Sequence, residues 1–213
     1  VDEWGVWAVP SNTVNAEIDQ KPWGIAPAIS EQIYTLEDAL LFAGMQMVIL
    51  RNADVIKIAC QSLLTNISAC IMTEKNGEYW LQTIYYPFHY FATYAKGTVL
   101  KTASIGPCYS CAEFDGVPYV DSLVVWNEED QELVIFAVNR SEEELQKAEV
   151  DLQDFEIQHV IESICMTAEN KKMTNMEQHD AVIPKKEKNV EIETGRCQIA
   201  LQPLSFNMVR LAV

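Results

Sequence analysis

Hydrophobic periodicity changes near Gly97 and divides the chain into two regions. In the first region, TLEDALLFAGMQMVILR (Thr35 to Arg51) places apolar residues three and four positions apart, the spacing of one face of an α-helix. Thr35 is a suitable N-cap, and Asp38 stands at the capping-box position. The pattern therefore predicts a core helix that begins directly after Thr35.

The segment after this helix predicts a strand and a second helix. Val55 to Cys60 form an apolar run without strict alternation, as expected for a parallel strand covered on both faces. After a turn at Asn76-Gly77, GEYWLQTIYYPFHYFATYAKG predicts a helix through Tyr94, with a kink at Pro87 and a stop at Gly97.

The first four residues, Val1 to Trp4, are predicted to be the end of a strand. Residues 1–97 then run strand, loop, helix, strand, helix, which is the order of the last two β/α units of a parallel fold. A complete (β/α)8 TIM barrel takes about 250 residues. The preceding strands are therefore expected to lie in other polypeptide.

From Thr98 onward the apolar residues alternate with a period of two. Leu123–Trp126 and Leu133–Phe136 flank the turn sequence NEED, which predicts a hairpin. Later strand-like segments are AEVDLQDFE, IQHVIESICM, NVEIETGRCQIALQP and SFNMVRLAV. Short strands without long helices predict that residues 98–213 form an antiparallel β-sandwich, with residues 168–188 as a surface loop. The fold class is thus α/β plus all-β.

Composition narrows the choice of partners. The formal net charge is −16 and the sequence pI is about 4.5. Nucleic acid and anionic membrane surfaces are bound through clustered lysine and arginine, so we expect neither as a partner. The longest apolar run, Ala39 to Leu50, is too short to span a bilayer of about 30 Å. A neutral substrate remains compatible with the composition.

The cysteines predict free thiols. They are scattered through apolar segments without the spacing of a disulfide framework, at positions Cys60, Cys70, Cys108, Cys111, Cys165 and Cys197. Cys108 and Cys111 form a C-x-x-C, but no second cysteine pair or nearby histidine completes the four ligands of a zinc site, so we expect no bound metal. We predict a cytoplasmic location, and secretion stays open because the first residue is not Met.

Five segments follow one another through nearly the whole chain: VDEWGVW, IAPAISEQIYTLEDALLFAGMQMVILRNADVIKIAC, IMTEKNGEYWLQTIYYPF, VPYVDSLVVWNEEDQELVIFAVNRS and LQPLSFNMVRL. In this order they resemble the C-terminal portion of α-L-arabinofuranosidases of glycoside hydrolase family 51. The resemblance implies a (β/α)8 barrel packed on a jelly-roll-like sandwich. It also implies retaining release of terminal α-L-arabinofuranosyl groups from arabinoxylan, arabinan or their oligosaccharides, without cofactor, by a homo-oligomeric full-length protein.

The resemblance assigns two site residues at the start of the chain. In the family motif DEWNVW the glutamate ends the seventh barrel strand and is the catalytic nucleophile, and that position is Glu3 here. Trp7 matches a tryptophan that shapes the sugar subsite, with core packing as the alternative. The general acid/base of the family lies upstream of the residues present, so this chain alone is expected to have no useful turnover.

Two positions depart from the family pattern. Gly5 stands where the family often has Asn, and the family segment ACLAQLVN is ACQSLLTN here, which puts Leu63 at the position of a sugar-contacting Gln. Gln61, two residues earlier, would face the same side of an extended strand and could replace that amide; a structural role is the alternative. The rival function is a non-catalytic carbohydrate-binding or structural sandwich module, supported by residues 1–97.

Overall fold

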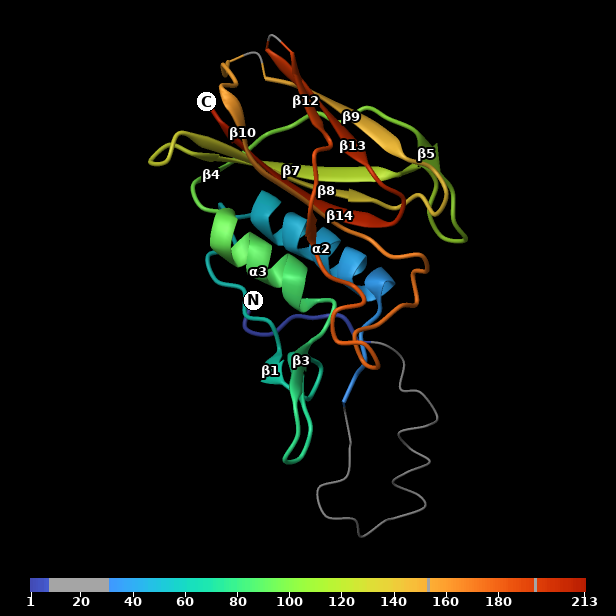
Figure 1. The fold of residues 1–213 in the computed structure, drawn as a ribbon. Helices are drawn as coiled ribbons and strands as arrows, with labels where there is room; N and C mark the ends of the chain where they lie inside the picture. The colour runs from blue at the N-terminus through green and yellow to red at the C-terminus, as the bar shows by residue number, and fades with distance from the viewer. Residues whose placement is uncertain (8–30, 153, 194) are drawn as a thin grey trace.

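The described part of the chain is built in layers (Figure 1). The computed structural model describes residues 1–7, 31–152, 154–193 and 195–213. Two helices pack on one face of a six-stranded sheet, and a three-stranded sheet covers the other face. A further small sheet lies beyond the helices, on the side of the N-terminus (Figure 1).

Helix α2 (Leu36–Arg51) begins where the sequence predicts. The Asp38 backbone N–H donates to the Thr35 hydroxyl, and the Thr35 N–H donates to the Asp38 carboxylate at 2.8 Å. This reciprocal capping box satisfies N–H groups that have no partner inside the helix. The predicted N-terminus is confirmed.

Helix α3 (Tyr85–Tyr94) is shorter than predicted. Tyr79–Leu81 form strand β3, so the prediction of a helix through this whole segment is wrong. The Trp80 side chain is buried, and the β3 backbone pairs with a neighbouring strand, which outweighs helix propensity. Pro87 consequently lies in the first turn of α3, where its missing N–H would have no helical partner anyway.

The first residues of the chain pair in parallel with residues 58–62. The amino group of Val1 donates to Ile58 O, Trp4 N–H to Cys60 O, and Ser62 N–H to Trp4 O, at 2.9, 3.0 and 3.0 Å. This pairing joins the two segments predicted to be neighbouring strands. The pair Trp4 and Gln61 fixes its register.

The predicted strand boundaries at Val55 to Cys60 are wrong. Val55 and Ile56 belong to turns that continue from the end of α2, because both N–H groups donate to Asn52 O. Val55 and Ile58 are 77% and 71% exposed, so the segment is not covered on both faces. The hydrogen-bonded pairing with the first residues of the chain starts at Ile58.

A small sheet of order β1-β2-β3 follows directly after Ser62. Strand β1 (Leu63–Thr65) pairs in parallel with β2 (Ala69–Thr73), which forms an antiparallel hairpin with β3. The hairpin turn contains Asn76, in the left-handed region at φ 58°, followed by Gly77. The turn at Asn76-Gly77 is thus where the sequence places it, but it joins two strands.

The remaining strands confirm the prediction of two antiparallel sheets. The six-stranded sheet has the order β11-β10-β14-β8-β7-β4, and the three-stranded sheet has the order β12-β13-β9. The strands are β4 (Thr98–Leu100), β7 (Val120–Asn127), β8 (Glu132–Asn139), β9 (Gln146–Asp151), β10 (His159–Met166), β11 (Lys185–Lys186), β12 (Val190–Glu193), β13 (Arg196–Leu201) and β14 (Ser205–Ala212). Two short strands, β5 (Cys108–Tyr109) and β6 (Val117–Pro118), pair with each other.

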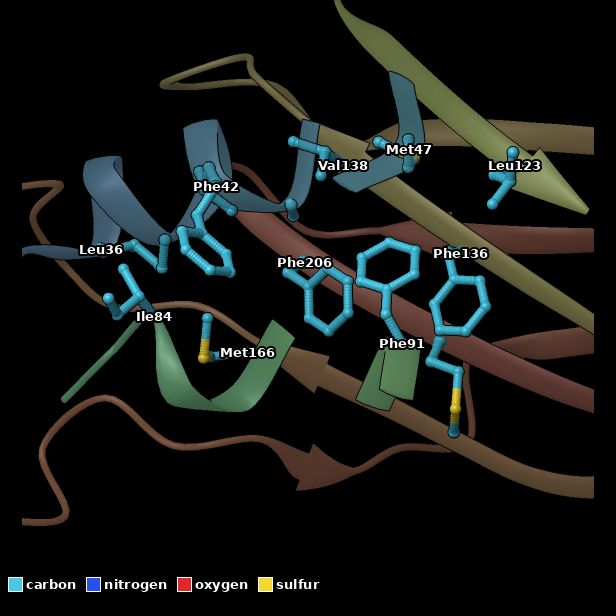
Figure 2. Packing of buried hydrophobic residues seen from close by; sticks show 14 of the residues in the cluster. Leu36, Phe42, Met47, Ile84, Phe91, Leu123, Phe136, Val138, Met166 and Phe206 are labelled. Carbon is cyan, nitrogen blue, oxygen red and sulfur yellow. The ribbon is translucent and has the colours of Figure 1, made fainter. Parts of the chain in front are cut away.

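Strand β8 is buried along its whole length because both of its faces are covered. Figure 2 shows Phe136 of β8 and Phe206 of β14 beside Phe91 of α3 and Phe42 of α2, between the helices and the sheet. The rings of Phe91 and Phe136 stack with centroids 4.2 Å apart. The opposite face packs on the second sheet. The helices and the six-stranded sheet therefore share one hydrophobic core.

The segment predicted to be a surface loop, residues 168–188, is only partly a surface loop. It contains β11, and its Asn175 and Val182 are buried. Asn175 donates to Leu81 O and Val182 O at 3.0 and 3.1 Å and accepts from the Val182 N–H. These hydrogen bonds fasten the segment against β3.

Candidate functional site

The first seven residues present two different faces. Trp4 and Val6 are buried, at 6% and 7% exposure, and the Trp4 ring lies 4.6 Å from that of Phe42. Side chains alternate across an extended strand, so Glu3 and Trp7 point to the opposite side, away from the helices. Both are exposed in the described structure. The two residues that the sequence singles out thus share one open face.

A hydroxyl group holds the Glu3 carboxylate. Ser62 Oγ donates to Glu3 Oε1 at 2.6 Å. The parallel register that pairs Trp4 with Gln61 places Ser62 opposite Gly5, hence on the face of Glu3. The carboxylate therefore stands at the end of a paired strand with one oxygen hydrogen-bonded.

The Trp7 ring lies over Gly5, on the face of the segment that Glu3 also occupies. A Cβ atom added to Gly5 would lie 3.4 Å from Cη2 of the Trp7 ring, so the indole covers Gly5. The ring remains 52% exposed. An exposed indole face can pack on the apolar face of a sugar ring. Trp4, by contrast, is packed in the core.

Gln61 is not brought together with Glu3. Its position opposite Trp4 puts it on the helix side of the pair, and its amide Nε2 donates to Ser68 O at 3.1 Å. In this structure the Gln61 amide is thus engaged with the backbone of Ser68. Sequence analysis missed Ser62, the next residue. Only the register with Trp4 reveals that the Ser62 side chain, and not that of Gln61, lies on the same face as Glu3.

A buried glutamine supports the strand that carries Glu3. Gln82, 1% exposed, accepts from the Tyr34 N–H at 2.9 Å and donates to Ala69 O and Gln32 O, both at 2.8 Å. The Tyr34 hydroxyl in turn donates to Val6 O at 2.8 Å. Burial raises the pKa of Tyr34 to about 12, so its phenol stays a donor through the physiological range. This network links four segments behind the Glu3 face.

Other candidate groups in the described residues are not gathered into a site. Within the described ranges no three His, Cys, Asp or Glu side chains are grouped to hold a metal ion. Cys108 and Cys111 are exposed free thiols. The Asn127 amide donates to the Asp130 carboxylate at 2.7 Å, which fits a solvated hairpin turn. No helix of the described part is both long and apolar enough to cross a bilayer.

A groove of about 1150 Å³, lined by both apolar and charged side chains, runs along the outer face of α2. Leu41 and Val48, 56% and 53% exposed, line its helix wall together with Gly44, and Val1 lies at its edge. Arg140 lines it from the sandwich side. Half-exposed leucine and valine on one helix face are typical of a surface that another element covers.

Comparison with known proteins gives a consistent result. The family described as "Alpha-L-arabinofuranosidase C-terminal domain" matches residues 2–205. The intracellular exo-α-(1→5)-L-arabinofuranosidase of Halalkalibacterium halodurans is 42% identical over 210 residues, covering 99% of this chain and 41% of that protein. Intracellular exo-α-(1→5)-L-arabinofuranosidase 1 of Bacillus subtilis is 39% identical over 211 residues, with coverage of 99% and 41%. The chain thus spans about two fifths of these relatives.

Solved structures share the fold. AbfB, a family 51 α-L-arabinofuranosidase from Bifidobacterium longum, superposes with a TM-score of 0.84 at 27% identity, covering 98% of this chain and 40% of that one. The GH51 arabinofuranosidase of Xanthomonas axonopodis pv. citri gives a TM-score of 0.84 at 23% identity, with coverage of 99% and 40%. The antiparallel sheets and the two packed helices are therefore an arrangement found in solved arabinofuranosidases.

Proposed function

The chain belongs to the α-L-arabinofuranosidase C-terminal domain family of GH51 enzymes, and on that premise we propose that it carries the nucleophile of a retaining glycoside hydrolase. The substrates would be terminal α-L-arabinofuranosyl groups of arabinan, arabinoxylan or their oligosaccharides. One observation carries the proposal. The Glu3 carboxylate stands at the end of a paired strand, hydrogen-bonded to Ser62, on the same open face as the Trp7 indole.

In the proposed reaction a Glu3 oxygen attacks the anomeric carbon of the arabinose. The bond from that carbon to the leaving oxygen breaks, and the leaving oxygen takes a proton from a carboxylic acid. Water then attacks the anomeric carbon, gives a proton to the resulting carboxylate and releases Glu3. Two inversions give net retention. Trp7 would pack on the sugar ring and orient it for attack.

The second carboxyl group would come from polypeptide outside these 213 residues. Retaining enzymes place the two groups about 5–5.5 Å apart, at the C-terminal ends of different strands when the scaffold is a barrel. The exposed apolar residues Leu41 and Val48 of α2, and Val55 and Ile58 beyond it, are the surface that further barrel units would cover. The chain alone would then bind and turn over sugar poorly, and residues 1–97 would be the last two units of the barrel.

We also propose a cytoplasmic location and a homo-oligomeric full-length protein. The relatives from Halalkalibacterium halodurans, Bacillus subtilis and Acetivibrio thermocellus are named intracellular. The six cysteines of this chain are free, which suits a reducing compartment. Neither nucleic acid nor membrane is expected as a partner, given the net charge of −16.

Hydrolysis of p-nitrophenyl α-L-arabinofuranoside tests the proposal. The assay uses the complete encoded polypeptide that contains these residues, its Glu3→Ala variant, and Asp2→Asn as a matched control at the neighbouring exposed carboxylate. We expect Glu3→Ala to abolish turnover while Asp2→Asn retains it. An active polypeptide indifferent to Glu3→Ala would defeat the assignment. An inactive polypeptide that binds arabinan would support the rival carbohydrate-binding module.

A further inference from the structure

Ser62 is anchored to the Glu3 strand through both its backbone and its side chain. Its N–H donates to Trp4 O at 3.0 Å, and its hydroxyl donates to Glu3 Oε1 at 2.6 Å. The neighbouring Gln61 side chain points to the opposite face of this segment, where its amide donates a hydrogen bond to Ser68 O. The Ser62 hydroxyl is therefore held in place by a register that does not depend on the carboxylate itself.

The hydrogen bond fits the chemistry of an attacking carboxylate. An O–H to carboxylate distance of 2.6 Å is typical of a charge-assisted hydrogen bond. The terminal torsion of a glutamate is broad, so a carboxylate without such a partner samples many orientations. With Oε1 engaged, Oε2 is the oxygen left to attack. Among the residues that the structure describes, Ser62 is the side chain seen to donate to this carboxylate.

We propose that Ser62 is a positioning residue for the nucleophile, an inference that rests on the proposed role of Glu3. Its hydroxyl directs Oε2 at the anomeric carbon and retains its proton throughout. When the ester forms on Oε2, Oε1 becomes a neutral carbonyl oxygen and accepts a weaker hydrogen bond. When water releases the sugar, Oε1 regains negative charge and the bond strengthens. Ser62 therefore favours the second step, in which the carboxylate leaves.

This difference between the two steps predicts a specific kinetic signature. Removing the hydroxyl slows release of Glu3 more than it slows attack, so the covalent intermediate accumulates. A hydrogen bond to a charged group is strong enough that its loss changes a rate by about tenfold or more. We expect Ser62→Ala to lower kcat about tenfold, to lower kcat/KM less, and to show a burst of one p-nitrophenol per active site.

The experiment measures pre-steady-state and steady-state hydrolysis of p-nitrophenyl α-L-arabinofuranoside by the complete polypeptide. Ser62→Ala is compared with Ser62→Thr, which keeps a hydroxyl, and with Ser110→Ala, a control at an exposed serine of the sandwich. Ser62→Cys serves as a second variant of similar volume whose thiol is a weak donor. We expect the burst in Ser62→Ala and Ser62→Cys, and behaviour close to wild type in the other two.

Three results would overturn the inference: rates of Ser62→Ala within twofold of wild type, slow turnover without a burst, or a Ser62→Thr variant as slow as Ser62→Ala. A Glu3→Ala variant in the same series separates the two claims. If Glu3→Ala keeps wild-type turnover, the proposed function itself fails. If Glu3→Ala is inactive and Ser62→Ala is normal, only the role of Ser62 is refuted.

Discussion

The hydroxyl of Tyr34 donates a 2.8 Å hydrogen bond to the backbone carbonyl of Val6. Tyr34 is 1% exposed and directly precedes the N-cap of α2, while Val6 belongs to the segment that carries Glu3. The start of the main core helix is thus tied to the candidate catalytic strand through a buried side chain. The position of Glu3 depends on this contact as well as on the pairing with residues 58–62.

Replacing Tyr34 by Phe removes this donor and leaves Val6 O buried without it. We expect the free energy of unfolding to fall by about 1–3 kcal/mol, the usual cost of an unsatisfied buried polar group. Denaturant unfolding of the chain measures the change, with Tyr79→Phe, 70% exposed, as the control. Equal stabilities of the two variants would contradict the importance of the contact.

Tyrosine and cysteine side chains with raised pKa values predict a loss of folding stability at alkaline pH. Burial raises the pKa of Tyr34 and of Tyr86 from 10.0 to about 12, and that of the Cys70 thiol from 9.0 to about 12. The folded state therefore holds protons that the unfolded state releases. Stability from these groups is complete below about pH 9 and is lost as the pH rises toward 12.

Denaturant unfolding between pH 8 and pH 11 would measure this loss. Tyr34→Phe should flatten the dependence above pH 10, because one of the raised groups is gone. A free energy of unfolding that stays constant across this range would contradict the burial of these groups.

Gly97 is expected to tolerate no side chain. Its φ is +114°, and an added Cβ would lie 2.1 Å from Trp126 O, a backbone atom that cannot move without disturbing β7. We expect Gly97→Ala to destabilise the fold by more than about 2 kcal/mol, since strain and a backbone clash add. Thermal unfolding checks this, with Gly106→Ala as control because nothing lies within 4 Å of that position. A normal melting temperature for Gly97→Ala would refute the close approach of Gly97 to Trp126 O of β7.

Glu132 and Arg210 form a partly buried ion pair between β8 and β14. The Glu132 side chain is 6% exposed, and Arg210 also lies 4.4 Å from the centroid of the Tyr94 ring. Glu132→Ala should cost about 3 kcal/mol, because it leaves a partly buried guanidinium whose partners among the described residues are then Glu162, 3.6 Å away, and the Tyr94 ring. Glu128→Ala, in the exposed turn, should cost less than about 0.5 kcal/mol. Equal denaturation midpoints for the two variants would contradict this prediction.

Local signals in the sequence were enough for some elements. The α2 N-terminus follows from a Thr35 and Asp38 capping box, and the β7–β8 hairpin follows from alternating apolar residues around NEED. In both cases the residues that decide the structure are neighbours along the chain. The capping hydrogen bonds of α2 and the pairing of the β7–β8 hairpin are local, so the pattern alone suffices to predict them.

Elements that depend on distant partners were predicted less well. The segment from Val55 to Cys60 has the composition of a buried strand, but Val55 and Ile58 are exposed in the described structure and its first residues continue the turns after α2. Likewise, only the register with Trp4 shows that Ser62, rather than Gln61, lies on the face of Glu3. A shift of one residue moves every side chain to the other face, and no local pattern fixes that register.

Covalent trapping tests the central claim, the nucleophilic role of Glu3, most directly. A 2-fluoro α-L-arabinofuranosyl fluoride reacts with a retaining enzyme and leaves a long-lived ester, because fluorine at carbon 2 slows its hydrolysis. The complete polypeptide is incubated with this reagent, digested and analysed by mass spectrometry. We predict one fluoro-arabinosyl group per subunit, on the peptide that contains Glu3, and none in Glu3→Gln. A label on any other carboxylate, or labelling that persists in Glu3→Gln, would contradict the account.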